Sequence, residues 1–453
     1  MGKHKIPENG IYDARTLGAG RMLLLGFQHM FAMFGATILV PILTGLDVSN
    51  TLLFAGLGTL LFHLITGGKV PAFLGSSFAF LGGYAAIAPM IDDSIPNTEL
   101  LPYACFGVAC AGLVYAVLAA LVRAFGAEKV MRFFPPIVTG PIIIAIGLNL
   151  SASAINNCSG NWWIAIAAIG IIVAANIWGR GMVKIIPILL GVVGSYLLAV
   201  IFDAGVRETL VKNVSEAALL ALPVKMDQTV FGLFARGNVD RDMLLTAVIT
   251  IVPLSLATMV EHIGDVSAIS STCGRNYIQD PGLHRTLLGD GLATTLAALF
   301  GAPANTTYGE NTGVLALSRI YDPRVIRIAA VLAMCFSFSP KFAAIISSMP
   351  GGTIGGVSLV LYGMISAVGV RNVVENQVDF TKSRNVLIAA LILVLSIGIS
   401  YSKAGALTFG SVSLSGLAVG SLVGIVLNAV MPGKDYVFGQ NPQGDESVNF
   451  IIQ

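Results

Sequence analysis

The sequence predicts an all-α membrane protein that crosses the bilayer many times. Three observations support this prediction: 55% of the 453 residues are hydrophobic, only 11% are charged, and the mean hydropathy is +0.82. An ordinary soluble domain has about 25% charged residues, which cover its surface. A membrane β-barrel has alternating segments of about ten residues, whereas the apolar runs in this chain are continuous and about twenty residues long. These figures exclude a disordered chain, a nucleic-acid-binding protein and an ordinary soluble domain.

Fourteen apolar runs are candidate transmembrane segments. In chain order they cover residues 21–45, 50–67, 75–91, 101–123, 131–153, 162–178, 183–203, 242–268, 286–302, 305–319, 325–348, 352–370, 384–401 and 411–431. The third and tenth runs are short for a full crossing. Both begin in irregular, hydroxyl-rich sequence, GSSF at residues 75–78 and NTTY at residues 305–308. We therefore expect two broken helices among the fourteen segments.

Charge indicates how the chain is divided and how it is oriented. A polar stretch of mixed charge, residues 204–241, separates two seven-segment halves, residues 21–203 and 242–431, and is interpreted as an extracytoplasmic linker. Lys and Arg concentrate in cytoplasmic loops. With the N-terminus in the cytoplasm, the inner loops carry most of the Lys and Arg residues. We therefore expect both tails, residues 1–20 and 432–453, on the cytoplasmic side.

The two halves share local patterns. Gln28-His29 in the first segment matches Glu261-His262 in the eighth, and the two hydroxyl-rich sequences match at nearly the same offset. An odd number of segments per half inverts the second half relative to the first. This inverted repeat is typical of secondary transporters, which bind substrate where paired broken helices meet near the middle of the bilayer.

Carboxyl groups inside the segments are the first candidates for a site, because burying a charge in lipid is costly. Glu261 and Asp265 lie four residues apart in the eighth segment, and Glu310 follows the irregular start of the tenth. Such groups can accept N–H donors from a polar ligand, and a buried carboxyl can carry a proton. The alternative that these residues serve helix packing stays open.

Other ionisable residues in the segments are assigned more modest roles. His29 and His262 are interpreted as buried, neutral hydrogen-bonding residues. Asp290, near the inner end of the ninth segment, and Lys341, near the outer end of the eleventh, have no assigned function. The sequence contains no recognisable phosphate loop, zinc-protease motif or nucleophile elbow. We therefore expect neither an enzyme nor a cofactor or metal, and an ion gradient or the substrate's own gradient would supply the energy.

Several motifs resemble the nucleobase–ascorbate transporter family. The stretch ENTGVLALSR at residues 310–319 resembles the family signature [QEP]-N-x-G-x-x-x-x-T-[RKG], with Ser318 in place of the usual Thr. Gln28-His29 is similar to the family's QH motif. PAFLGSSFAF at residues 71–80 and DPGLHR at residues 280–285 are similar to bacterial uracil permeases. The likeness extends over about residues 20–430.

The resemblance implies a division that composition does not reveal. Segments 1–4 and 8–11 would form a core domain that carries the substrate, and segments 5–7 and 12–14 a gate domain that makes a homodimer interface. Two short strands, residues 75–78 and 305–308, would precede the third and tenth half-helices.

The resemblance also implies roles for individual residues. Glu261 and Glu310 would hold the uracil ring through its N–H groups, and backbone N–H groups near Phe78, Tyr308 and Gly309 would meet its carbonyls. Ala36 and Phe78 would pack against the ring, and Tyr308 would line the pocket. Proton coupling would involve Glu261, Asp265, Glu310 and His262. The supporting residues would be Gln28, His29, Ser77, Thr307 and Asn311. Some relatives have a second histidine at the position of Asp265.

We therefore predict proton-coupled uptake of uracil across a bacterial cytoplasmic membrane by an elevator-type mechanism. The glutamate at the start of the signature resembles that of the family's uracil transporters, whereas the family's xanthine and urate transporters have glutamine at this position. A xanthine or purine permease, or an anion transporter or channel on the same fold, remains an alternative. The expected partners are a small nucleobase, membrane lipid and a second copy of the chain, without nucleic acid.

Overall fold

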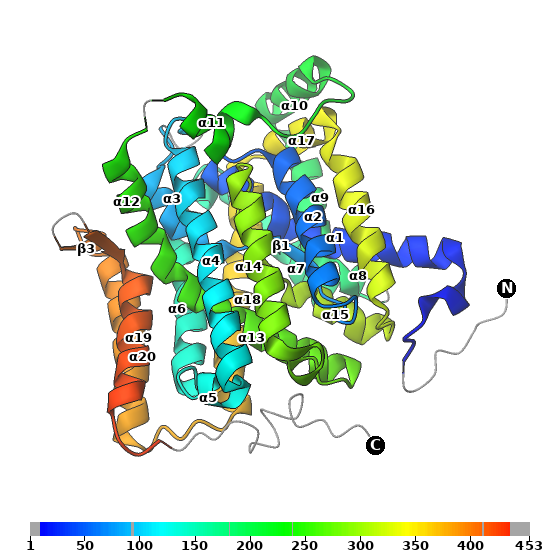
Figure 1. Cartoon of the computed structure of the whole chain (residues 1–453). Coiled ribbons are helices and arrows are strands. Elements are labelled where there is room, and N and C mark those ends of the chain that lie inside the picture. Colours follow the sequence, from blue (N-terminus) through cyan, green and yellow to red (C-terminus); the bar gives the residue numbers. More distant parts are fainter. Residues whose placement is uncertain (1–9, 92–94, 181, 238, 410–411, 435–453) are drawn as a thin grey trace.

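The computed structural model describes residues 10–91, 95–180, 182–237, 239–409 and 412–434, and this part of the chain is mainly helical (Figure 1). The helices before the linker are η1 (Ala14–Leu17), α1 (Ala19–Thr44), α2 (Val48–Ile65), η2 (Phe78–Phe80), α3 (Leu81–Ile87), α4 (Leu101–Phe125), α5 (Ala127–Met131), α6 (Pro136–Ser159), α7 (Trp162–Ile177), α8 (Met182–Ile185) and α9 (Pro187–Phe202). The linker contains α10 (Ala204–Glu216), η3 (Met226–Gln228) and α11 (Val230–Ala235). The helices after it are α12 (Arg241–Ile251), η4 (Val252–Leu254), α13 (Ser255–Cys273), η5 (Ile278–Gly282), α14 (Leu283–Leu299), α15 (Gly309–Ser318), α16 (Pro323–Ser337), α17 (Pro340–Ser347), α18 (Gly351–Glu375), α19 (Ser383–Ser400) and α20 (Gly416–Val430). The described strands are β1 (Leu74–Ser76), β2 (Asn305–Thr307), β3 (Ala406–Phe409) and β4 (Val412–Ser415).

Many of these helices have the length and composition of membrane spans. Among the described residues, seven helices are long and apolar enough to cross a membrane, or nine if each of two bent pairs counts as one span. Shorter apolar helices, such as α7 and α20, lie beside them. Most of the predicted apolar runs overlap one helix or a broken pair of helices, but the runs at 75–91, 305–319 and 411–431 contain a strand before their helix. The chain is thus a helical, multi-pass membrane protein.

Polar side chains and glycines mark where several helices begin and end. Asp47, Asn161 and Asp322 accept backbone N–H groups at the starts of α2, α7 and α16. These caps satisfy donors that have no partner inside the helix. Gly45 and Gly274 end α1 and α13 in the left-handed conformation that glycine adopts without strain.

The structure differs from the sequence prediction in three places. The run predicted at residues 325–348 is two helices, because α16 and α17 meet at a bend of 87°. Pro340 has no N–H, and the preceding Ser339 is extended, with φ −104° and ψ 95°. The predicted linker is partly helical, and α10 turns 108° away from α9. The hairpin of β3 and β4 adds strands beyond the two that the resemblance implies.

The helices pack in two main groups. α14 lies against α4 and α2, and α16 lies against α1 and α2, whereas α18 lies against α6 and α7, and α19 against α6 and α20. Gly112 of α4 and Gly291 of α14 bring their helices close together. A Cβ on Gly112 would lie 2.6 Å from Gly291 O, and one on Gly291 would lie 2.5 Å from Gly112 O. Small residues permit this approach between membrane helices.

Candidate functional site

Two strands that are far apart in the sequence pair beside α1, α2 and α14, at a place that we call the crossing; Figure 1 labels β1 there. β1 and β2 pair antiparallel, with Gly75 opposite Thr306. The pairing continues beyond both strands, since Ser77 N donates to Ala304 O at 2.8 Å and Tyr308 N donates to Phe73 O at 3.1 Å. The resemblance implies strands at residues 75–78 and 305–308. β1 begins one residue earlier, at Leu74, and β2 begins at the expected residue, Asn305.

Polar side chains from neighbouring helices satisfy the rest of the strand backbone. Thr59 of α2 donates its hydroxyl to Leu74 O at 3.2 Å and accepts Leu74 N at 2.9 Å. Thr294 of α14 donates to Asn305 O at 2.5 Å, and Asn305 Nδ2 donates to Phe54 O at 2.8 Å. Irregular backbone inside a membrane protein requires such partners. The chain can therefore interrupt two helices here and leave α3 and α15 as half-helices that begin at the crossing.

Tyr308 joins the crossing to α1. Its Oη donates to Ser76 O at 2.8 Å and accepts from Thr37 Oγ1 at 3.2 Å, and Ser76 Oγ donates to Thr37 O at 3.1 Å. A Cβ on Gly75 would lie 2.6 Å from Thr37 Oγ1 and 2.6 Å from Tyr308 Cζ. Glycine at this position is thus what lets the Tyr308 ring lie close against β1. No role for Thr37 is predicted from its local sequence, because its partner lies 271 residues away.

One face of α13 points at the start of α15. Glu261 and Asp265 lie one turn apart and are half-buried. Thr307 Oγ1 donates to Asp265 Oδ2 at 3.1 Å. A Cβ on Gly309 would lie 3.5 Å from Asp265 Oδ1, so this carboxylate lies at the N-terminal end of α15, where the helix dipole favours negative charge. The structure therefore brings Asp265, Thr307 and Gly309 together.

A buried acid–imidazole pair lies behind Thr307. His262 Nδ1 is 3.4 Å from Asp290 Oδ2, and both side chains are fully buried. Thr307 Oγ1 is also 3.4 Å from His262 Nδ1. Asp290, to which the sequence assigns no function, lies in α14 and is completely buried. A carboxyl inside an apolar run was the available signal, but its partner on another segment was not visible.

The remaining predicted residues lie around the same crossing. The Phe78 ring packs edge-on against Tyr362 of α18, with centroids 5.6 Å apart. Asn311 Nδ2 donates to His29 O at 3.5 Å, which joins the signature stretch to α1. Ser77 is buried beside β1, and Gln28 is half-buried next to His29.

Two predicted site residues are described only by their backbone. Ala36 is in α1 and Glu310 is in the first turn of α15, but both side chains lie outside the described residues. Lys341 is half-buried in α17, at the far side of the bend from α16.

The comparisons with known proteins agree with the motifs. A family model described as "Permease family" (Xan_ur_permease) matches residues 20–405. The chain is 40% identical over 442 residues to the uracil permease of Bacillus caldolyticus, covering 94% of this chain and 95% of that protein. It is 36% identical over 417 residues to the uracil permease of Escherichia coli (strain K12), covering 90% of each.

Solved structures with the same fold are more distant in sequence. The transmembrane domain of the cyanobacterium bicarbonate transporter BicA is 14% identical, with a TM-score of 0.56 and coverage of 93% of this chain and 99% of that chain. The murine Slc26a9 anion transporter is 11% identical, with a TM-score of 0.59 and coverage of 94% and 69%. At this identity the likeness concerns the fold alone. The family match and the close relatives confirm the resemblance: the chain belongs to this permease family and is a membrane transporter, not an enzyme.

Proposed function

We propose that this permease takes up uracil together with a proton, at a site formed where β1 and β2 cross. Proteins named uracil permeases are 36–40% identical to this chain over about nine-tenths of its length. The observation that supports the location best is the bond between Thr307 and Asp265, at 3.1 Å, which brings the acidic face of α13 to the start of α15.

The chemistry of the crossing fits a uracil ring. Uracil offers two N–H donors and two carbonyl acceptors, and carboxylates are acceptors only. Glu261 and Glu310 would accept the N–H groups. The Tyr308 N–H is already bonded to Phe73 O, so the donors for the carbonyls would come from Phe78 and Gly309, because the first N–H groups of a helix have no partner within that helix. The Phe78 ring and Ala36 would pack on the base.

A chain of polar groups supports the proton coupling. It runs from Asp265 through Thr307 to His262 and Asp290, with steps of 3.1, 3.4 and 3.4 Å. In our proposal one carboxyl among Asp265, Asp290, Glu261 and Glu310 binds a proton from the extracellular side of the membrane and releases it on the cytoplasmic side. Asp265 would take the place of the histidine that some relatives have at this position.

We also propose that the chain has fourteen segments in two inverted repeats. The core domain would hold α1–α4 and α12–α17, and the gate domain α6–α9 and α18–α20, which agrees with the two packing groups. The core would move against the gate in an elevator-type cycle. The gate domains of two copies would form a homodimer in a bacterial cytoplasmic membrane, with both tails in the cytoplasm and the linker outside.

Two other substrates are kept as alternatives. A xanthine or purine permease of the same family would use the same crossing. Anion transport is favoured only by the fold that the chain shares with BicA and Slc26a9. Carboxyl groups at the site argue against an anion, because like charges repel in a low-dielectric environment.

Uptake of labelled uracil by cells that lack their own uracil transport tests the proposal. We expect saturable uptake that unlabelled uracil abolishes and that xanthine and bicarbonate leave unchanged. We expect Glu261→Gln and Glu310→Gln to abolish accumulation against a gradient. Glu375→Gln is the matched control, because Glu375 makes an exposed pair with Arg371 on the surface of α18. Stronger inhibition by xanthine than by uracil, or full accumulation by both site variants, would contradict the proposal.

A further inference from the structure

Residues 10–17, which we call the N-terminal strap, lie against the ends of helices from the second half of the chain. Ile11 pairs with the loop between α15 and α16: Ile11 N donates to Arg319 O and Tyr321 N donates to Ile11 O, both at 2.8 Å. Arg319 ends α15 in the left-handed region, with φ 53°. Residues with a side chain rarely adopt this conformation. The strap backbone thus holds the end of α15 in an unusual but defined geometry.

Tyr12 extends the strap to the end of α13. Its hydroxyl donates to Cys273 O at 2.5 Å. Its ring lies against the Tyr321 ring, with centroids 5.3 Å apart, and the Arg275 guanidinium lies over it at 4.1 Å. One side chain therefore contacts both the end of α13 and the loop that follows α15.

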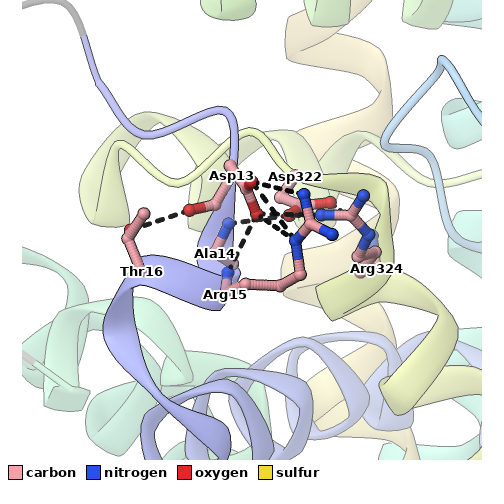
Figure 2. Close-up of polar contacts among 6 residues, drawn as sticks. All are labelled: Asp13, Ala14, Arg15, Thr16, Asp322 and Arg324. Carbon is pink, nitrogen blue, oxygen red and sulfur yellow. Dashed lines mark hydrogen bonds and ion pairs between the residues drawn. The ribbon is translucent and has the colours of Figure 1, made fainter.

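The start of α16 is bound by the next two residues of the strap (Figure 2). Ala14 N donates to Asp322 Oδ2 at 2.7 Å, and both residues are buried. Arg324 Nη1 donates to Asp13 Oδ1 at 2.9 Å and to Asp322 Oδ2 at 3.3 Å, which links strap and helix through one guanidinium. Hydrogen bonds from Arg15 lower the pKa of Asp13 below its usual range.

The helices tied together by the strap are those that carry the site. The strap leads into α1, and it contacts the ends of α13, with Glu261 and Asp265, and of α15, which starts at Gly309. At 1.5 Å per residue, about 12 Å of helix separates Asp265 from Cys273, and about 15 Å separates Gly309 from Arg319. Over such distances a helix acts as a rigid rod, so a shift at the strap changes the spacing between Asp265 and Thr307.

We propose that the strap sets the spacing of α13 and α15, and that Tyr12 is a positioning residue for substrate binding. This inference rests on the proposed site for its effect on transport, but the spacing itself is a separate property. Residues outside a site that couple to it typically change affinity by about 2- to 30-fold. We therefore expect Tyr12→Ala to raise the KM for uracil within this range while the maximal rate changes less.

Conservative and control variants separate positioning from general damage. Tyr12→Phe keeps the ring against Tyr321 and Arg275 but loses the bond to Cys273 O, so its KM should lie between those of the wild type and Tyr12→Ala. Thr16→Ala is the matched control, because the Thr16 hydroxyl donates to Asp13 O within the strap itself. Its KM should equal that of the wild type.

Spin labels measure the spacing without any substrate. In a full-length variant whose native cysteines are replaced, labels at Ser271→Cys in α13 and Ala316→Cys in α15, both exposed positions, should give one narrow distance distribution. Tyr12→Ala should broaden or split it, and Thr16→Ala should not. An unchanged distribution together with an unchanged KM in Tyr12→Ala would overturn the inference. If the parent protein fails to take up uracil, the substrate proposal falls, and the distance distribution alone decides for or against the strap.

Discussion

Replacing Gly75 with alanine tests whether β1, Tyr308 and α1 form one tightly packed unit. The added Cβ would lie 2.6 Å from Thr37 Oγ1 and 2.6 Å from two carbons of the Tyr308 ring, whereas carbon contacts are most favourable at about 3.5–4.0 Å. The ring is buried, and it cannot swing away without breaking the bond to Ser76 O. Overpacking of this kind costs about 1–3 kcal/mol, which corresponds to about a 5- to 140-fold change in an equilibrium constant.

Uracil affinity and thermal unfolding of the purified protein measure this cost. We expect Gly75→Ala to bind uracil more weakly, to have a lower Tm, or both. The loss of binding free energy and the loss of unfolding free energy should together amount to about 1–3 kcal/mol. Gly82→Ala in α3 is the matched control, because its Cβ would meet nothing within 4 Å. Alanine favours a helix over glycine by about 1 kcal/mol, so the control should bind uracil normally and be no less stable.

Two results would contradict this prediction. If Gly75→Ala binds uracil and unfolds as the wild type does, the contact between β1 and Tyr308 does not hold the site. If Gly82→Ala is damaged to the same extent, the effect of Gly75→Ala comes from any added methyl group and not from this packing.

Three further predictions concern other polar groups. Thr307→Val should slow uracil uptake by about 10- to 150-fold, the value of a hydrogen bond to a charged group, whereas Thr307→Ser should stay near the wild-type initial rate; equal rates for both variants would contradict this. Asp290→Asn should cost about 1–3 kcal/mol of stability by weakening the buried pair with His262, seen as a lower Tm, and an unchanged Tm would show that the pair contributes nothing. The lowered pKa of Asp13 means that its stabilising contribution is complete above the usual aspartate pKa of about 3.9 and is lost only as the pH falls below it. The spin-label distances should therefore be the same at about pH 8 and pH 5, and broadening within that interval would count against the role of Asp13.

The helices themselves could be predicted because lipid allows few alternatives. A spanning backbone must satisfy its own hydrogen bonds, so a long apolar run becomes a helix. The runs at residues 101–123 and 384–401 correspond to α4 and α19 with small shifts at their ends. The hydroxyl-rich sequences at residues 75–78 and 305–308 likewise indicated the broken helices that are found at β1 and β2.

Contacts between distant residues could not be predicted from local patterns. Ala14 meets Asp322 across 308 residues, and neither position lies in a motif that names its partner. His262 and Asp290 were both visible as ionisable residues in apolar runs, but only the packing of α13 against α14 makes them a pair. The bend before Pro340 could have been predicted from the proline, because the residue before a proline disfavours the helical conformation. A prediction based on the length of the apolar run alone misses it.

The most direct test of proton-coupled uracil transport is uracil accumulation in proteoliposomes that contain the purified protein, with and without an imposed proton gradient. If uptake is coupled to protons, uracil accumulates above its external concentration only while the exterior is more acidic, and Glu261→Gln abolishes this accumulation while Glu375→Gln does not. Accumulation that is independent of the gradient, or that persists in Glu261→Gln, would contradict it.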